Sequence, residues 1–220
     1  MTQETKDQPT STRSANMAKR RESILSQARK LIATEGFEAL KLRDLAGKAG
    51  VTVPTIYNLI GGKPEILAII IEDLVEQLQK AQQSVATTDA ESAFEARINQ
   101  LADLFATDED YYRAAFIAGD HSGLFEQQSD TGIYARSVQP LIGACAAAQK
   151  KGHLLGHVSA DQMGRQIYGC YRLARQDWTN GYFDLNAFRA QALTGIYLCL
   201  AADAEPAFRH RLLEKVSGFR

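Results

Sequence analysis

The stretch Leu42–Lys63, LRDLAGKAGVTVPTIYNLIGGK, carries the local signals of two short helices joined by a tight turn. Leucine and alanine recur three and four residues apart before Gly50, a spacing that predicts a helix with one apolar face. Gly50 stands where a helix ends in the left-handed conformation, which costs glycine least. Pro54 follows early in the next segment, where a missing backbone amide costs a helix nothing. We therefore predict a second helix from about Val53.

Two short helices with this joint form a helix-turn-helix, which places its second helix in a groove of DNA. The same pattern occurs in plain helical bundles, so the spacing alone leaves both interpretations open. The distribution of charge favours the first. Residues 13–63 hold 10 Lys and Arg against 4 Asp and Glu, a net charge of +6, whereas residues 64–220 hold 14 against 20, a net charge of −6. A basic end on an acidic body suits phosphate binding by that end.

The segment Arg20–Leu67 resembles the N-terminal DNA-binding domain of the TetR family (TetR/AcrR-like) of bacterial transcriptional regulators. The shared features are the apolar stripe of ILSQARKLI at 24–32, EGF at 35–37, AGV at 49–51, TIY at 55–57 and Lys63. The resemblance spans roughly a quarter of the chain. It implies an all-α protein with a three-helix, homeodomain-like helix-turn-helix domain over residues 17–64. A helical ligand-binding and dimerisation domain would follow over residues 65–220.

The resemblance also implies which side chains meet DNA. The family inserts the start and exposed side of the second helix into the major groove, and the matching positions are Thr52, Val53, Pro54, Thr55, Tyr57 and Asn58. The amide of Asn58 can pair with adenine through two hydrogen bonds, and a phosphate or water contact is the alternative. Phosphate contacts are expected of Lys41, Arg43, Tyr57 and Lys63.

Three positions depart from the family pattern. Lys41 stands where Ser or Thr usually caps the first helix of the motif, which weakens that cap. Pro54 replaces glycine or another small residue, and Ile60 replaces a phenylalanine. None of these changes breaks the motif.

The rest of the chain predicts about ten helices in all. Its 220 residues are 45% hydrophobic with only 5 prolines, so it can bury a sizeable core. Helix starts beyond the motif are expected near Pro64, Asp89, Asp108, Thr131, Ser159, Asp184 and Pro206. Residues 119–130 have the composition of a loop or a broken helix.

Targeting signals are absent from this pattern. Apolar runs stay far below the roughly 20 residues that cross a bilayer. Residues 1–16 are polar and predict a disordered arm, whose Arg13 either tracks a DNA groove or is merely solvated. Cys145, Cys170 and Cys199 stand in apolar settings and are expected to be reduced core residues of a cytoplasmic protein.

A ligand site in the second domain follows more from the resemblance than from the residues. The candidates for lining it are Phe94, Phe105, Tyr112, Phe116, Tyr134, Tyr168, Tyr171, Arg172 and Trp178, and each of them is plain core in the alternative interpretation. The family pairs its last two long helices with those of a second subunit. Here that predicts a dimer interface at Phe188, Ala192, Gly195, Ile196 and Cys199, again with ordinary core as the alternative.

Catalytic patterns are weak, and we expect neither an enzyme nor a bound cofactor or metal. Asp108, Glu109 and Asp110 are consecutive, so they point around a helix start rather than toward each other. His153 and His157 have helical spacing, but neighbouring glycines disfavour a helix there.

The sequence therefore predicts a homodimeric DNA-binding transcriptional regulator. It would be a repressor that a small-molecule effector releases from a palindromic operator, with half-sites about 34 Å or a multiple of a helical turn apart. The alternative, from a different class, is a DNA-independent small-molecule sensor or protein-interaction module that retains the fold.

Overall fold

The protein is described here by a computed structural model that covers residues 10–83, 90–126 and 132–219. Within these ranges the regular structure consists of ten α-helices and one short 3₁₀ helix, which confirms the all-α prediction. The elements are α1 (Thr10–Glu35), α2 (Leu42–Ala49), α3 (Val53–Leu59), α4 (Lys63–Gln83), α5 (Ala90–Ala106), α6 (Glu109–His121), η1 (Leu124–Glu126), α7 (Ile133–Lys150), α8 (Ala160–Thr179), α9 (Leu185–Ala201) and α10 (Pro206–Ser217).

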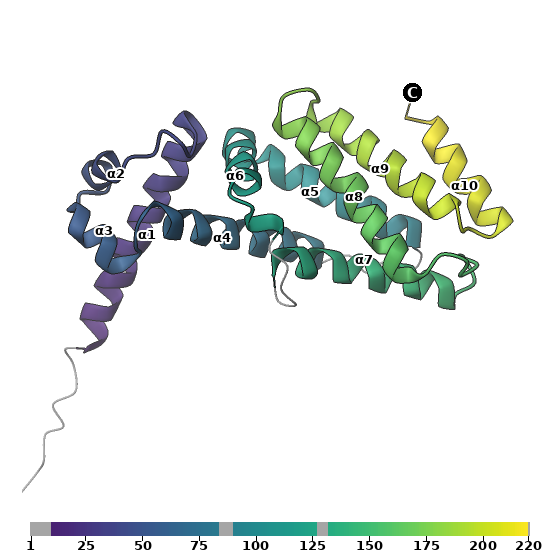
Figure 1. Ribbon diagram of the computed structural model, residues 1–220, viewed down its shortest axis with the longest axis horizontal. Coiled ribbons are helices and arrows are strands. Elements are labelled where there is room, and N and C mark those ends of the chain that lie inside the picture. The colour runs from purple at the N-terminus through teal and green to yellow at the C-terminus, as the bar shows by residue number, and fades with distance from the viewer. Residues whose placement is uncertain (1–9, 84–89, 127–131, 220) are drawn as a thin grey trace, which may run out of the picture.

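The molecule is elongated, and its two ends are joined by one long helix (Figure 1). Helices α1, α2 and α3 form one end, which we call the head. Helices α5 to α10 form the other end, the body, and α4 runs from the head into it. Helix α6 stands at the junction and packs against both α1 and α4.

The head folds as the local signals predict. Helix α2 ends at Gly50, which adopts the left-handed conformation with φ of 65°. The backbone amide of Val51 donates to the carbonyl of Ala46 at 3.0 Å and closes the turn before α3. Ile24 and Ile32 of α1 are fully buried together with Ile56 of α3, so apolar contacts hold α3 against the rest of the head.

The predicted disordered arm over residues 1–16 is wrong for its second part, because α1 already begins at Thr10. No glycine or proline lies between residues 10 and 35, so a helix anchored at Ile24 can extend toward the N-terminus by one hydrogen bond per added residue. Residues 14–23 of this extension are exposed. Residues 1–9 and the side chain of Arg13 lie outside the described part.

The body helices begin at the predicted capping residues. The side chain of Asp108 accepts a hydrogen bond from the amide of Tyr111 at 3.2 Å. Ser159 and Gln162 form a reciprocal capping box at the start of α8, and Asp184 caps α9. The predicted starts at Asp89 and Thr131 fall on residues outside the description.

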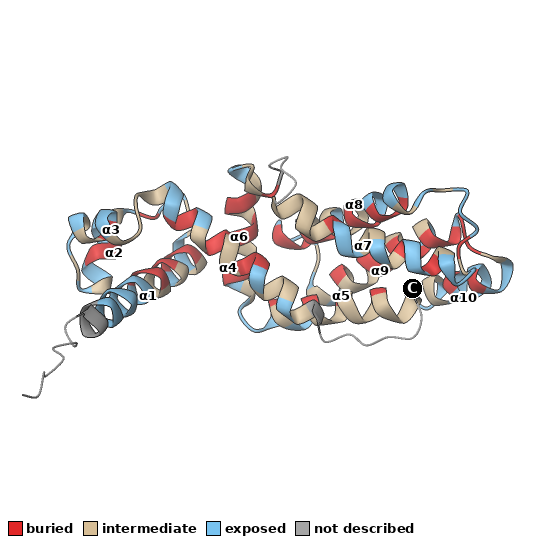
Figure 2. Ribbon diagram, turned by 90° about the horizontal axis from the view of Figure 1, so that it is seen from below, coloured by how far each residue is buried: buried red, intermediate tan, exposed pale blue. Residues whose placement is uncertain are grey.

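The segment predicted as a loop or broken helix is partly helical, since α6 continues to His121 and η1 follows. Buried residues gather along the inward sides of the body helices, and exposed residues cover their outer sides (Figure 2). Along the parts of the chain described here, none of the helices has the length and apolar character needed to cross a bilayer.

Candidate DNA-binding surface and ligand cavity

Helix α3 presents a polar outer face above its buried anchor, Ile56. Pro54, Tyr57 and Asn58 are exposed, and Tyr57 keeps 57% of its surface accessible. Thr52 is also exposed, and its hydroxyl oxygen lies 2.9 Å from that of Thr55. Val53 and Thr55 are half-buried. The predicted base-reading positions therefore share one end of the head, although not all of them are equally accessible.

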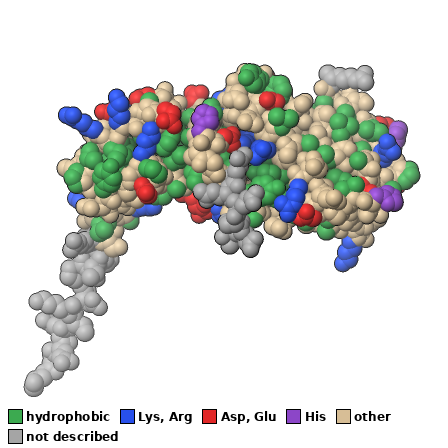
Figure 3. Space-filling view, in the orientation of Figure 1, with side chains coloured by type: hydrophobic (Ala, Val, Ile, Leu, Met, Phe, Trp, Pro, Cys, Tyr) green, Lys and Arg blue, Asp and Glu red, His purple; other side chains and the backbone are tan. Residues whose placement is uncertain are grey.

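Exposed basic side chains surround this helix. Lys41 precedes α2, and Arg43 lies in its first turn. Lys41 makes no side-chain capping bond, as its replacement of Ser or Thr predicts. Lys48, in the last turn of α2, is exposed as well, although the family pattern did not single it out. Several Lys and Arg side chains are visible on the head in Figure 3.

Lys63 differs from the other predicted phosphate contacts because its amine already has partners within the head. The Lys63 Nζ donates to the backbone carbonyl of Glu38 at 2.9 Å and lies 3.8 Å from the Glu38 carboxylate. It also sits 4.6 Å from the centre of the Phe37 ring. Lys63 thus connects the start of α4 to the turn between α1 and α2. The spacing of residues along the sequence does not predict this contact.

Two adjacent acidic residues of α4 connect the head to the body. Asp73 accepts a hydrogen bond from Arg29 of α1 at 2.5 Å. Glu72 forms a bidentate ion pair with Arg136 of α7, in which the two terminal guanidinium nitrogens lie 2.6 and 2.8 Å from the two carboxylate oxygens. This guanidinium lowers the pKa of the Glu72 carboxyl. One helical turn therefore carries ionic contacts to both ends of the molecule.

A cavity of about 550 Å³ opens among α4, α5, α7, α8 and α9. This volume lies within the range of small-molecule sites. Its wall is mixed, with nearly as much polar as apolar surface, and its polar members are Gln79, Arg97, Arg136, Ser137, Tyr168 and Tyr171. Three of the predicted lining residues, Phe94, Tyr168 and Tyr171, belong to it.

The other predicted lining residues are not part of this wall. Four of them form an aromatic cluster in the core, in which Phe105 stacks on Trp178 with ring centres 4.9 Å apart and Phe116 and Tyr112 pack against Phe105. Tyr134 packs edge-on against Tyr168, and Arg172 is half-buried on α8. Aromatic spacing marks the inward side of a helix, and both the packed core and this cavity lie on that side, so for these six residues a ligand contact stays a prediction.

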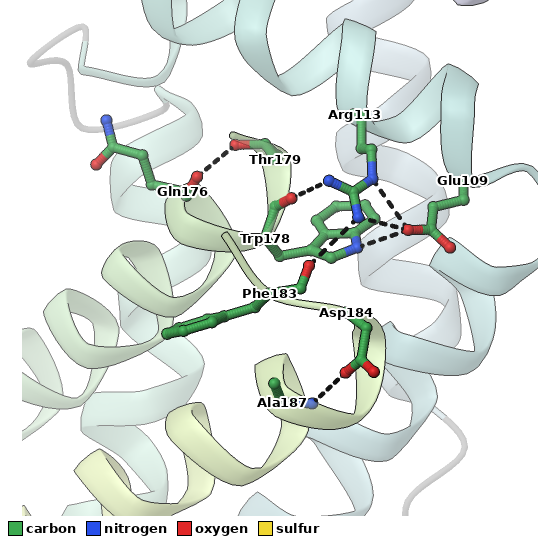
Figure 4. Close-up of polar contacts among 8 residues, drawn as sticks. All are labelled: Glu109, Arg113, Gln176, Trp178, Thr179, Phe183, Asp184 and Ala187. Atoms are coloured by element: carbon green, nitrogen blue, oxygen red, sulfur yellow. Dashed lines mark hydrogen bonds and ion pairs between the residues drawn. The ribbon is translucent and has the colours of Figure 1, made fainter. Parts of the chain in front are cut away.

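The aromatic cluster is held by a polar network that joins α6 to the end of α8 (Figure 4). The Trp178 indole donates to Glu109 at 3.1 Å. Arg113 donates to the same carboxylate oxygen at 2.9 and 2.6 Å and also to the backbone carbonyl of Trp178. A further bond reaches the carbonyl of Phe183 at 3.4 Å. Glu109 is thus a structural partner of Trp178 in this fold.

The predicted dimer residues divide into two groups. Phe188, Ala192 and Ile196 lie in the core of the chain itself, with at most 2% of their surface exposed, so little of them is left to meet a partner. They lie on the inward side of α9, which packs against α5 and α8 of the same chain. Gly195 and Cys199 are half-buried where α9 crosses α8. A Cβ at Gly195 would come within 2.8 Å of the Cys170 Cβ, so glycine permits this close crossing.

The three cysteines are free thiols, as expected. Burial raises the pKa of the Cys145 thiol to about 12. The Sγ atoms of Cys170 and Cys199 lie 3.7 Å apart, and this contact lowers the pKa of Cys170 to about 7. Among the described residues, no group of three or more His, Cys, Asp or Glu side chains is placed to hold a metal ion.

This architecture resembles that of known proteins. The family described as "Bacterial regulatory proteins, tetR family" matches residues 24–68. No curated protein sequence matches the chain. Among solved structures, CprB, a TetR-family protein from S. coelicolor A3(2), aligns with a TM-score of 0.67 and 14% identity over 91% of this chain and 97% of its own.

Two further structures cover most of the chain. A γ-butyrolactone receptor, described as an ArpA-like protein, aligns with a TM-score of 0.63 and 14% identity over 93% of this chain and 97% of its own. A TetR-family transcriptional regulator from Pectobacterium atrosepticum aligns with a TM-score of 0.66 and 21% identity over 86% of this chain and 96% of its own. Residues 24–68 therefore match the tetR family of bacterial regulatory proteins, and the chain has the fold of solved TetR-family proteins.

Proposed function

We propose that this protein is a homodimeric repressor whose binding to a palindromic operator is controlled by a small molecule in the body cavity. The observation that carries the proposal is the physical connection of two sites by one helix. Helix α4 begins beside the recognition helix, and its Val75, Leu78 and Gln79 line the cavity. The fold shared with a γ-butyrolactone receptor supports a ligand-binding body.

The DNA-binding surface of this proposal is the exposed side of α3 with its basic surroundings. Thr52, Pro54, Tyr57 and Asn58 would meet the major groove, with Val53 and Thr55 contributing less because they are half-buried. Lys41, Arg43 and Lys48 would bind phosphates. Residues 17–64 would act as the DNA-binding domain, and residues 65–220 as the ligand-binding and dimerisation domain.

Dimerisation would use the outer side of α8 and α9 rather than their buried side. Leu173 of α8 and Leu198 of α9 are 57% and 49% exposed. They flank the crossing at which Gly195 brings the two helices close together. Two large apolar side chains on adjacent exposed helix faces suit burial against a second copy, and a two-fold pair of heads would read two half-sites.

Release from DNA would act through α4. A ligand shifts a protein between two arrangements only as far as it binds one of them more tightly. Glu72 contacts a cavity residue, Arg136, while its neighbour Asp73 contacts Arg29 in the head. A ligand that changes the position of Arg136 would therefore move the helix that positions the head.

The test is the salt dependence of binding to DNA from upstream of the protein's own gene, measured by fluorescence anisotropy. Each phosphate contact contributes about 0.9 to the slope of log K against log salt. We expect a steep slope for the natural protein and a slope shallower by about that amount for Arg43→Ala. The matched control is Arg209→Ala, which removes an exposed cation from α10 in the body.

Binding that ignores salt, or an Arg43→Ala slope equal to that of the natural protein, would contradict the DNA-binding proposal. It would favour a sensor that retains the fold without binding DNA. A separate titration of the DNA complex with candidate effectors tests release, so a failure of release is distinguishable from a failure of DNA binding.

A further inference from the structure

The cavity wall contains two arginines with different surroundings. The Arg136 guanidinium is neutralised by both carboxylate oxygens of Glu72. Arg97, on α5, makes no hydrogen bond or ion pair with any residue that the structure describes. Burial is the cause that lowers its pKa, and no nearby carboxylate offsets this effect. The cavity therefore carries one positive charge without a counter-charge among the described residues.

The surroundings of Arg97 make this charge unusual. Its neighbours in the wall include Phe94, Ile98 and Leu101, which occupy the same helix and are buried. A half-buried cation next to apolar groups loses part of its hydration and gains nothing in return unless an anion joins it. Structural arginines of this protein, such as Arg113 and Arg175, instead pair with Glu109 and Asp120.

We propose that the cavity binds an apolar molecule bearing one anionic group, a carboxylate, sulfonate or phosphate, and that Arg97 binds this group. The guanidinium presents a planar set of donors that matches two oxygens of such an anion. The apolar side chains of the wall would contact the rest of the molecule. Its identity as the effector rests on the function proposed above, but its binding does not depend on DNA.

Two tyrosines of the wall fit the same ligand. Burial raises the pKa of both Tyr168 and Tyr171, so their hydroxyls stay protonated and can donate hydrogen bonds. The described residues of the wall include no carboxylate that could bind a cation, and Glu72, outside the wall, is already paired with Arg136. The charge balance of the cavity thus favours an anion over a cation.

Two dyes that differ by one anionic group test the proposal. 8-Anilinonaphthalene-1-sulfonate is an apolar anion, and N-phenyl-1-naphthylamine is the same molecule without the sulfonate. Both become fluorescent in apolar sites, so titration gives their dissociation constants. We expect Arg97→Met to weaken sulfonate binding by about tenfold or more, the effect of losing a charge-assisted hydrogen bond, and to change binding of the neutral dye by less than about twofold.

Three further variants control for fold and for location. Arg97→Lys keeps the charge and should retain most of the sulfonate affinity, which covers the case in which Arg97→Met fails to fold. Ser137→Phe fills the cavity from α7 and should abolish binding of both dyes. Arg165→Gln removes a cation paired with Asp161 on the outside of α8 and should leave both affinities unchanged.

Several results would overturn the proposal. These are equal weakening of both dyes by Arg97→Met, sulfonate binding that survives in Ser137→Phe, and no binding of the sulfonate by the natural protein. Addition of the sulfonate dye to the DNA complex is a separate measurement. If the dye binds through Arg97 but does not release DNA, the anion site stands and the proposed control of DNA binding fails.

Discussion

At the scale of single residues, the structure gives adjacent side chains different tasks. Glu72 and Asp73 are neighbours on α4, yet one is paired with the body and the other with the head. Lys63 and Arg43 are both basic residues of the helix-turn-helix region, yet Lys63 is bound to Glu38 while Arg43 is exposed. Local contacts of this kind decide which charge is available to a ligand and which one holds the fold.

The Glu72–Arg136 pair predicts a pH dependence of stability. Arg136 lowers the pKa of Glu72 in the folded state, so the pair stabilises the fold above the ordinary carboxyl pKa of 4.5. This contribution is lost as the pH falls through the lower folded-state pKa. We expect the free energy of unfolding to fall less steeply below pH 4.5 in Glu72→Gln than in the natural protein. Urea denaturation at a series of pH values measures this, and parallel profiles would contradict it.

The variant Asn58→Ala distinguishes contacts to DNA bases from contacts to the DNA backbone. If its amide pairs with adenine, Asn58→Ala should weaken binding to the operator by about 1–3 kcal/mol and leave non-specific DNA nearly unaffected. Competition anisotropy with operator and scrambled duplexes measures both affinities. Tyr57→Phe is the matched control from the same exposed face, and it should weaken both complexes alike if the hydroxyl meets phosphate. Equal losses for Asn58→Ala on both duplexes would assign Asn58 to a phosphate or water contact.

At the scale of helices, close packing depends on where side chains are missing. Helices α7 and α8 approach each other at Gly164, where an added Cβ would lie 2.8 Å from the backbone nitrogen of Ile142. Backbone cannot yield as a flexible side chain does. This crossing places Ser137 and Leu141 of α7 with Ile167 and Tyr168 of α8 in the cavity wall, so its geometry also shapes the cavity.

We expect Gly164→Ala to destabilise the protein by about 1–3 kcal/mol, because overpacking forces the two helices apart. Gly143→Ala is the matched control on α7, since nothing lies within 4 Å of its added Cβ. In an exposed helical position alanine is favoured over glycine by up to about 1 kcal/mol, so this variant should be at least as stable as the natural protein. Thermal and urea denaturation compare the two, and similar stabilities would show that the helices separate without cost.

At the scale of the whole molecule, the asymmetry of charge and the exposed apolar face have separate consequences. The net charge of −1 hides a basic N-terminal region and an acidic remainder, so in the proposed function the head would approach DNA first. The large exposed apolar side chains of α8 and α9, Leu173 and Leu198, lie in the body, where a partner would hold two heads together.

The proposed dimer predicts a mass of twice 24.2 kDa in light scattering at micromolar concentration. Leu173→Glu places a charge on the proposed interface and should shift the protein toward the monomer and weaken binding to a palindrome. Leu155→Glu is the matched control, because Leu155 is 55% exposed but lies in the connection between α7 and α8. A dimer that tolerates Leu173→Glu, or one that only Leu155→Glu disrupts, would place the interface elsewhere.

The sequence by itself determined the helices and the helix-turn-helix. Gly50, Asp108, Ser159 and Asp184 act on backbone groups within a few residues, so their effects can be predicted without knowledge of the fold. The apolar stripe at 24–32 in α1 and the leucine and alanine spacing of α2 also indicated which sides of these helices are buried.

Only the tertiary structure decided what lies opposite each buried side. Trp178 and Tyr171 are both aromatic residues of α8, but one completes a packed cluster and the other borders a cavity. Phe188 belongs to the core of its own chain, and Arg97 faces a cavity without a partner among the described residues. Helical periodicity fixes the direction of a side chain relative to its own axis. The side chain that it meets on a neighbouring helix comes from a distant part of the chain, and only the packing of the helices decides which two side chains meet.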